Sequence, residues 1–245
     1  MTSDSAINTT RWTVWRITAY FVLVGIVFLV SQFLGVAALA VVEKLRDPAL
    51  DVSEWLNQNQ MSSSVLVAST LASTTICAPL VIALAGSNRW WFLRIQKTSA
   101  RSFLVWCGAL VALVAVSDLI TVLMGRPIVP DVMLDTYSSG HTIWLLLALV
   151  LFAPLFEEVF FRGFLLSALQ AVGAHQWVAA VISAALWSVL HLQYDPYGIV
   201  SIFVGALLLA AARFSTNSIL PCMAMHSLTN LIAYVETAYR AGAPA

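Results

Sequence analysis

The residues that could do chemistry are ionisable side chains inside apolar stretches of the chain. In the segment 156–162, Glu157 and Glu158 are adjacent, and Arg162 follows four residues after the second glutamate. Residues four apart lie on one face of a helix, so Glu158 and Arg162 can form an ion pair, while Glu157 points about 100° away from that pair. A desolvated carboxylate is suited to act as a general base near neutral pH. The alternative is that the ion pair only joins two helices and that Glu157 finds some other polar partner.

Two further pairs occur at the same spacing. Trp187 and His191 are four residues apart, as are His226 and Asn230. The aromatic ring can wall off one side of an imidazole, and the second pair can present an imidazole and an amide to one point. Taken alone, each pair is also typical of polar contacts between membrane helices. The case for chemistry therefore depends on all three segments together.

Together these side chains contain what peptide hydrolysis requires. Glu157 with His191 can orient and deprotonate a water, and His226 with Asn230 can donate hydrogen bonds to the oxyanion. Glu157, His191 and His226 are also candidate ligands for a divalent metal such as zinc, because two histidines and a carboxylate form known catalytic zinc sites. The HExxH pattern of many zinc proteases is missing from the sequence. The choice between metal-dependent and metal-free chemistry therefore stays open.

The composition places these residues in a membrane protein. The chain has 245 residues, of which 60% are hydrophobic and 10% are charged, against about 25% charged in a typical soluble domain. Several apolar stretches are long enough to cross a bilayer, so we expect an all-α, polytopic bundle of about 7–8 transmembrane spans. The formal net charge is zero, which leaves no basic surface for nucleic acid.

Polar breaks divide the chain into helices that must position the candidate residues. We expect N-terminal transmembrane helices over residues 1–135 and a site-bearing core over residues 142–235, within one bundle. A short interfacial helix is expected near residues 52–59, and Pro154 is expected to kink or break the fourth span. The predicted spans are residues 17–42, 64–86, 103–124, 142–171, 177–192, 197–212 and 216–238.

Three further features of the sequence concern the cysteines, a basic loop and an acid inside a predicted span. The three cysteines lie in apolar stretches without CxxC spacing and are expected to be core residues, not disulfides or metal ligands. The loop after the second predicted span contains four basic residues and no acid, so we expect it to face the cytoplasm. Asp118, inside the third predicted span, is expected to pair with Arg213 or with a backbone group.

The three motifs, in this order on successive apolar segments, resemble the CPBP family of intramembrane proteases. The motifs are Glu-Glu-x-x-x-Arg at 157–162, aromatic-x-x-x-His at 187–191 and His-x-x-x-Asn at 226–230. The family includes the type II CaaX prenyl endopeptidases and the bacterial Abi proteins linked to bacteriocin processing and self-immunity. The resemblance implies an intramembrane endopeptidase, glutamate-dependent or metal-dependent, in a multi-pass protein of a prokaryotic plasma membrane. Its partners would be membrane lipid and a protein or peptide substrate, lipidated or bacteriocin-like.

The resemblance also implies roles, position by position. Glu157 would be the base that activates water, with His191 as its partner. His226 and Asn230 would stabilise the oxyanion. The supporting positions would be Glu158 and Arg162.

One position departs from the family pattern. The second motif usually begins with Phe, and Trp187 occupies that position here. We expect the larger ring to preserve the aromatic wall and to narrow the cavity. Two rival interpretations are a catalytically inactive scaffold or immunity protein of the same fold and a small proton-coupled transporter. The transporter is disfavoured because the two halves of the sequence show no internal repeat.

Overall fold

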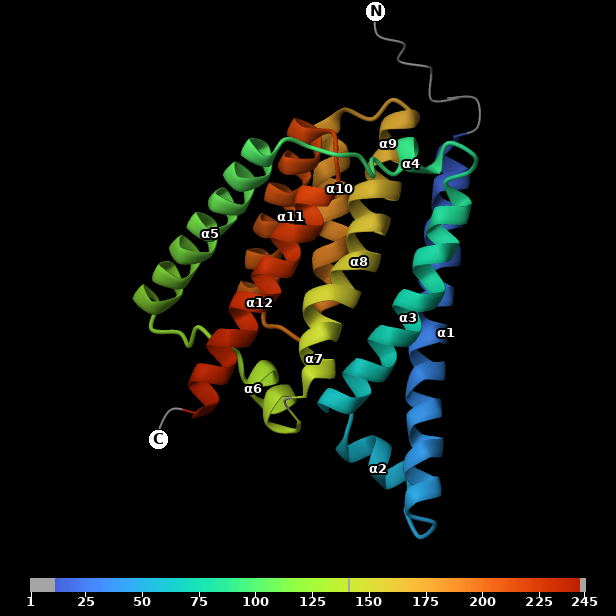
Figure 1. Ribbon diagram of the computed structural model, residues 1–245, viewed down its shortest axis with the longest axis vertical. Helices are drawn as coiled ribbons and strands as arrows, with labels where there is room; N and C mark the ends of the chain where they lie inside the picture. The colour runs from blue at the N-terminus through green and yellow to red at the C-terminus, as the bar shows by residue number, and fades with distance from the viewer. Residues whose placement is uncertain (1–11, 141, 243–245) are drawn as a thin grey trace, which may run out of the picture.

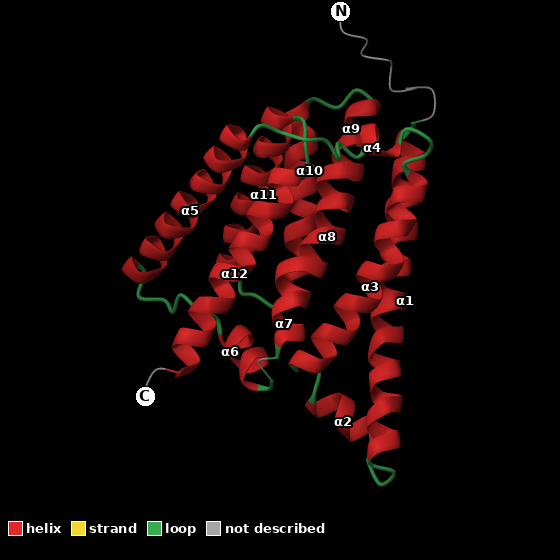
Figure 2. Ribbon diagram, viewed as in Figure 1, coloured by secondary structure: helices red, strands yellow, loops and turns green. Residues whose placement is uncertain are grey.

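The computed structural model describes residues 12–140 and 142–242. These residues form helices joined by loops and turns, with no strand among them (Figure 2). The helices are α1 (Val14–Arg46), α2 (Val52–Gln58), α3 (Ser63–Leu84), α4 (Arg89–Phe92), α5 (Ala100–Leu123), α6 (Asp131–Ser138), α7 (Ile143–Leu147), η2 (Ala148–Phe152), α8 (Ala153–Glu157), η3 (Glu158–Leu165), α9 (Leu166–Ala171), α10 (Gln176–Ser188), η4 (Val189–His191), α11 (Pro196–Thr216) and α12 (Leu220–Gly242).

The prediction of an all-α membrane bundle is confirmed. Each of the predicted spans corresponds to a helix, and 5 helices in the described part of the chain are long and apolar enough to cross a membrane. These are α1, α3, α5, α11 and the helix Ile143–Ala171, which runs from α7 to α9. Of the two other predicted spans, the segment Gln176–His191 forms a shorter apolar helix, and α12 has 23 residues and is more polar. The sequence therefore predicts where the helices lie better than it predicts how many of them span a bilayer.

The expected interfacial helix is also present. It is α2 (Val52–Gln58), and the side chain of Asp51 caps it by accepting hydrogen bonds from the backbone N–H groups of Ser53 and Glu54. A side-chain oxygen at this position satisfies donors that have no partner within the helix. Asp51 lies in a loop, and hydrogen bonds from the Ser53 hydroxyl and from the backbone hold its pKa below the ordinary value. The charged form of this cap is thereby favoured.

The helix Ile143–Ala171 forms the central column of the bundle (Figure 1). Helices α1 and α3 pack side by side, and both contact the column. Helices α10, α11 and α12 contact its other side, and α5 lies outside them against α11 and α12. Because α7 to α9 and α12 run in opposite directions, residues far apart in the sequence meet near the middle of both helices.

Pro154 does not break the column, so the predicted break is wrong. Hydrogen bonding shifts to an i→i−5 pattern in η2, where the N–H of Ala153 donates to the carbonyl of Ala148. In that pattern the carbonyl of Leu149 would accept from residue 154, but Pro154 has no N–H. Asn230 of α12 supplies the missing donor, with its Nδ2 at 2.7 Å from Leu149 O. The π-helical turn thus accommodates the proline without leaving a buried carbonyl unpaired.

Other carbonyls of the column accept hydrogen bonds from side chains of the surrounding helices. Phe152 O accepts from Thr74 of α3 at 3.0 Å, and Phe161 O accepts from Ser183 of α10 at 3.3 Å. The η3 segment ends with the N–H of Leu166 donating to the same Phe161 carbonyl, again with i→i−5 spacing. These bonds fix the column against α3 and α10.

The buried guanidinium of Arg213, on α11, makes a comparable contact. Its Nε donates to Arg162 O at 3.4 Å, and its Nη2 donates to Ser167 Oγ at 2.8 Å. Among the described residues Arg213 forms no ion pair with Asp118, so the first of the two partners predicted for Asp118 is wrong.

One face of the column is aromatic. Phe156, Phe160 and Phe164 recur every four residues and stack on one another, with centroid separations of 5.9 and 6.1 Å. Two phenylalanines of α1 stack on this row, Phe28 at 5.4 Å from Phe156 and Phe21 at 5.7 Å from Phe160. Such pairs contribute about 0.5–1.5 kcal/mol each beyond the burial of area. The aromatic row anchors α1, and the polar residues of the column lie on its other faces.

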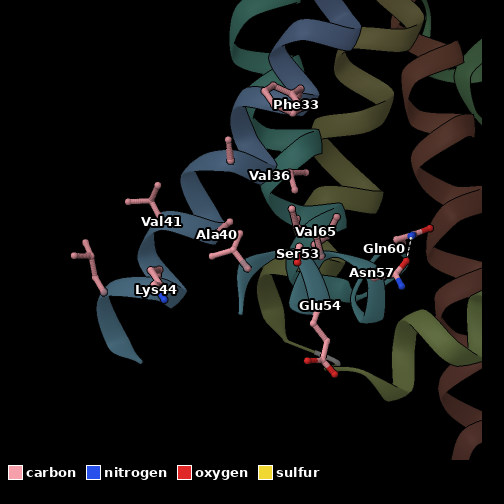
Figure 3. Close-up of a pocket in the computed structure, with 14 residues that line it drawn as sticks. Phe33, Val36, Ala40, Val41, Lys44, Ser53, Glu54, Asn57, Gln60 and Val65 are labelled. Atoms are coloured by element: carbon pink, nitrogen blue, oxygen red, sulfur yellow. Dashed lines mark hydrogen bonds between the residues drawn. The ribbon is translucent and has the colours of Figure 1, made fainter. Parts of the chain in front are cut away.

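A groove of about 1110 Å³ lies between the C-terminal part of α1, α2 and the start of α3 (Figure 3). Its walls include Phe33, Val36 and Ala40, and the polar side chains of α2 line one end. None of the candidate site residues lines this groove. The cysteines are free, as predicted, with Cys77 and Cys222 buried and Cys107 partly exposed.

Candidate active site

The predicted ion pair between Glu158 and Arg162 is present and fully enclosed. Arg162 Nη1 donates to Glu158 Oε1 at 3.0 Å, and the two side chains are 1% and 0% exposed. Removing one member of such a pair leaves an uncompensated charge in a medium of low dielectric constant. Two atoms, Glu158 Oε2 and Arg162 Nη2, are buried without a protein partner among the described residues. The pair therefore retains unused hydrogen-bonding capacity.

His226 on α12 completes this pair from a second helix. Its Nδ1 lies 2.9 Å from Glu158 Oε1. Because that oxygen also accepts from Arg162, it acts as a carboxylate acceptor, and Nδ1 carries the proton. The other ring nitrogen, Nε2, lies 4.0 Å from Glu157 Oε2. Glu158 thus orients the imidazole so that its second nitrogen faces the adjacent glutamate.

Glu157 is held by a residue of a third helix. The indole Nε1–H of Trp187 donates to Glu157 Oε2 at 2.5 Å. The Glu157 side chain is 22% exposed, in contrast to the enclosed Glu158. Of the two adjacent glutamates, Glu157 is therefore the accessible one, and Glu158 is the structural one.

Trp187 also organises the two histidines. Its ring meets those of His191 and His226 edge to face, with centroid separations of 4.9 and 5.2 Å. The guanidinium of Arg162 lies over the same indole, with Cζ at 4.5 Å from the ring centroid. A cation over an aromatic face is stabilised by the ring quadrupole. Trp187 is the side chain that connects the column, α10 and α12 at the site.

His191 lies at the end of η4, one turn after Trp187. Its Nδ1 is 3.0 Å from the carbonyl oxygen of Trp187. A carbonyl can only accept, so Nδ1 carries the proton and Nε2 of the neutral ring is free to accept one. The ring of Tyr194, in the following loop, is 6.3 Å from the imidazole, and burial raises the pKa of the Tyr194 phenol. The phenol is thereby kept in its protonated form.

Asn230 lies one turn beyond His226 on α12. One N–H of its amide is engaged with Leu149 O, which leaves the second N–H and the carbonyl oxygen of the amide for other partners. This residue therefore has a structural contact of its own in addition to any role in chemistry. That the side chains of His226 and Asn230 face a single point stays a prediction.

A metal site would require the three candidate ligands, Glu157, His191 and His226, to lie within reach of one ion. Among the described residues, no three His, Cys, Asp or Glu side chains are grouped so that they could hold one metal ion. Glu157 Oε2 and His226 Nε2 approach each other at 4.0 Å, whereas His191 is linked to them through the ring of Trp187. The geometry of this chain does not fit the predicted zinc set of Glu157, His191 and His226.

The structure brings together six residues of the three motifs by direct contact. These are Glu157, Glu158, Arg162, Trp187, His191 and His226. Several contacts of the site were not predicted from the sequence, among them the indole N–H on Glu157 and the aromatic neighbour Tyr194 of His191. The type of residue 187 was a usable signal for the first, because a buried tryptophan N–H normally finds an acceptor. The segment around Tyr194 carries no comparable signal.

Comparisons with known proteins bear on the same segment. Residues 139–232 match the family model described as type II CAAX prenyl endopeptidase Rce1-like. No curated protein and no solved structure gives a match. The matched segment is less than half of the chain, and it contains every residue of the three motifs. The segment 139–232 of this membrane protein is therefore similar to the type II CAAX prenyl endopeptidases described by the Rce1-like family model.

Proposed function

We propose that the chain is an intramembrane endopeptidase that hydrolyses a peptide bond of a membrane-associated or lipid-modified protein or peptide. The observation that carries this proposal is the position of Glu157. Its carboxylate is partly accessible, lies 4.0 Å from His226 Nε2, and adjoins an enclosed ion pair that holds the histidine in place. A carboxylate base beside an oriented imidazole is what the activation of water requires.

The chemistry begins with a water between Glu157 and His191. Glu157 takes one proton from this water, and the free Nε2 of His191 accepts a hydrogen bond that orients it. The water oxygen attacks the carbonyl carbon of the scissile bond and forms a tetrahedral oxyanion. The C–N bond then breaks, and the proton held by Glu157 passes to the leaving amine. Glu157 thus returns to its starting form, and the proton that it took from the water ends on the leaving amine.

The oxyanion is stabilised from α12. In the imidazolium form of His226, Nε2 carries a proton that it can donate, while Nδ1 stays bound to Glu158. The second N–H of Asn230 is available in the same way, since the first donates to Leu149 O. One such donor contributes about 3–4 kcal/mol to the stability of the transition state. Arg162 and Glu158 act by holding His226 and Trp187.

The test compares the parent chain with Glu157→Gln in cells that lack other copies of the protein. New protein N-termini in the membrane fraction are labelled and identified by mass spectrometry. We expect cleavage products that depend on the parent and that fall by at least about 100-fold in the variant, because a general base contributes about 10²–10⁴ to the rate. Asp118→Asn is the matched control, since it neutralises an acid in a span outside the site. Equal cleavage by the parent and Glu157→Gln would refute the proposal, and normal levels with no cleavage would favour the inactive scaffold.

The dependence on metal is tested separately. The purified chain is treated with a chelator, freed of metal by dialysis, and assayed on a substrate found by the N-terminal labelling. The geometry leads us to expect that the metal-free chain retains its activity. Loss of activity that zinc alone restores would show that the candidate ligands rearrange around an ion.

A further inference from the structure

The indole of Trp187 is placed to control the candidate base. Arg162 is bound to Glu158 and not to Glu157, and the imidazole of His226 stays 4.0 Å from Glu157 Oε2. The short hydrogen bond from the indole, 2.5 Å from Nε1 to Oε2, takes up one of its two oxygens. A hydrogen bond to a charged group is stronger than one between neutral groups. The indole therefore fixes the orientation of the carboxylate and leaves its other oxygen to bind water.

The indole itself has little freedom to move. Trp187 is 7% exposed. The guanidinium of Arg162 lies over one face of its ring, and the rings of His191 and His226 meet it edge to face. One helical turn earlier, Ser183 donates to Phe161 O of the column and fixes α10 against it. The donor is thus held at a set distance from Glu157 before any substrate binds. Such preorganisation is valuable because a misplaced base slows proton transfer.

A phenylalanine at position 187 would preserve most of these contacts. It would retain an aromatic face for Arg162 and an edge for the histidines, but it would provide no N–H. The hydrogen bond to Glu157 therefore depends on the tryptophan at this position. We propose that Trp187 is a positioning residue, whose indole N–H holds Glu157 in the orientation that activates water. This inference rests on the proposed function.

The test separates the donor from the ring. Trp187 is replaced by β-(3-benzothienyl)alanine through stop-codon suppression, which exchanges the N–H for a sulfur at almost the same shape. We expect kcat to fall about ten- to hundredfold, the range for one hydrogen bond to a charged group, with KM changed by less than about threefold. Trp187→Phe should show a similar loss. The matched control is the same replacement at Trp177, an exposed tryptophan on the same helix, which should leave both constants unchanged.

Two outcomes would overturn the inference. If the benzothienyl chain keeps the parent kcat while Trp187→Phe loses activity, the ring matters through its size and the donor does not. If both replacements change KM and leave kcat alone, Trp187 acts in substrate binding. A loss of protein from the membrane in either variant would be measured by its level and its melting temperature, and rates are compared per folded molecule.

A spectroscopic readout distinguishes failure of this inference from failure of the proposed function. The indole N–H of Trp187, labelled with ¹⁵N and assigned by its loss in Trp187→Phe, should show the downfield proton shift of a bond to a carboxylate. Glu157→Leu should abolish this shift whether or not the chain cleaves any substrate. A shifted proton in a chain without activity would refute the proposed protease function and support the Trp187–Glu157 hydrogen bond. An unshifted proton in an active chain would refute this hydrogen bond alone.

Discussion

The helix α5 and the segment η3 are both apolar, yet they differ in what surrounds them. Of the 24 residues of α5, the buried ones are Leu110 and Thr121. In η3, all 8 residues from Glu158 to Leu165 are buried. The first presents most of its surface to lipid, and the second is enclosed by other helices. Hydropathy alone does not separate the two, because lipid and protein interior are both apolar environments.

The ionisable residues do separate them. Asp118 in α5 is partly exposed, whereas Glu158 and Arg162 in η3 are enclosed and paired. The backbone differs as well, because carbonyls of the column accept bonds from side chains of other helices. A span that is surrounded by protein can therefore carry paired charges, and its backbone carbonyls can accept hydrogen bonds from side chains of neighbouring helices. Three substitutions at the enclosed column or at a side chain bound to it, each matched with one in α5, test this difference.

The largest effect is expected on removing the buried cation. Arg162→Met should lower the free energy of unfolding by about 3–5 kcal/mol, since it leaves Glu158 charged and unpaired. Asp118→Asn in α5 should change it by less than about 0.5 kcal/mol. Thermal unfolding of both chains in the same detergent measures the difference. A melting temperature of Arg162→Met equal to that of the parent would show that η3 is hydrated and not enclosed.

An intermediate effect is expected on removing the donor to Leu149. Asn230→Ala should cost about 1–3 kcal/mol of stability, because a buried carbonyl loses its partner. The amide of Asn230 donates to Leu149 O at 2.7 Å. Ser117→Ala in α5 is the counterpart and should lie within about 0.5 kcal/mol of the parent. If Asn230→Ala unfolds like the parent, then the π-helical turn satisfies its own carbonyl.

The smallest effect concerns two glycines. A Cβ added at Gly163 would approach Leu93 O at 3.1 Å, whereas a Cβ at Gly108 in α5 meets no atom within 4 Å. Gly163→Ala should therefore be destabilising by about 1 kcal/mol through overpacking. Gly108→Ala should be neutral or stabilising by up to about 1 kcal/mol, because alanine is the better helix former. The two melting temperatures should move in opposite directions, and a shared direction would contradict the close approach of α4 to η3.

Much of the fold could be predicted from the sequence, because long apolar runs bounded by polar residues correspond closely to helices. The pairing of Glu158 with Arg162 also follows from their spacing, and it is confirmed. The π-helical turns could not be predicted, since they depend on donors such as Asn230 that lie 81 residues away in the sequence. For the same reason, the bond between Trp187 and Glu157 depends on how α10 packs against the column. Two of the predicted spans correspond to a shorter apolar helix, Gln176–His191, and to the more polar α12.

The widened turns of η2 and η3 bear on the length of the chain as well as on its residue types. A turn bonded i→i−5 holds more residues than an α-helical turn, so the segment behaves as an α-helix that has accepted an insertion. Deleting one residue between Glu158 and Leu165 would let the segment return to α-helical bonding. Because the deletion removes the extra residue that the wide turn absorbs, the side chains after it would keep their faces of the column. The same deletion in an α-helical span such as α5 would rotate everything after it by about 100°. The widened turns are therefore the places in the column where the length of the chain can change by one residue without reassigning the faces of later side chains.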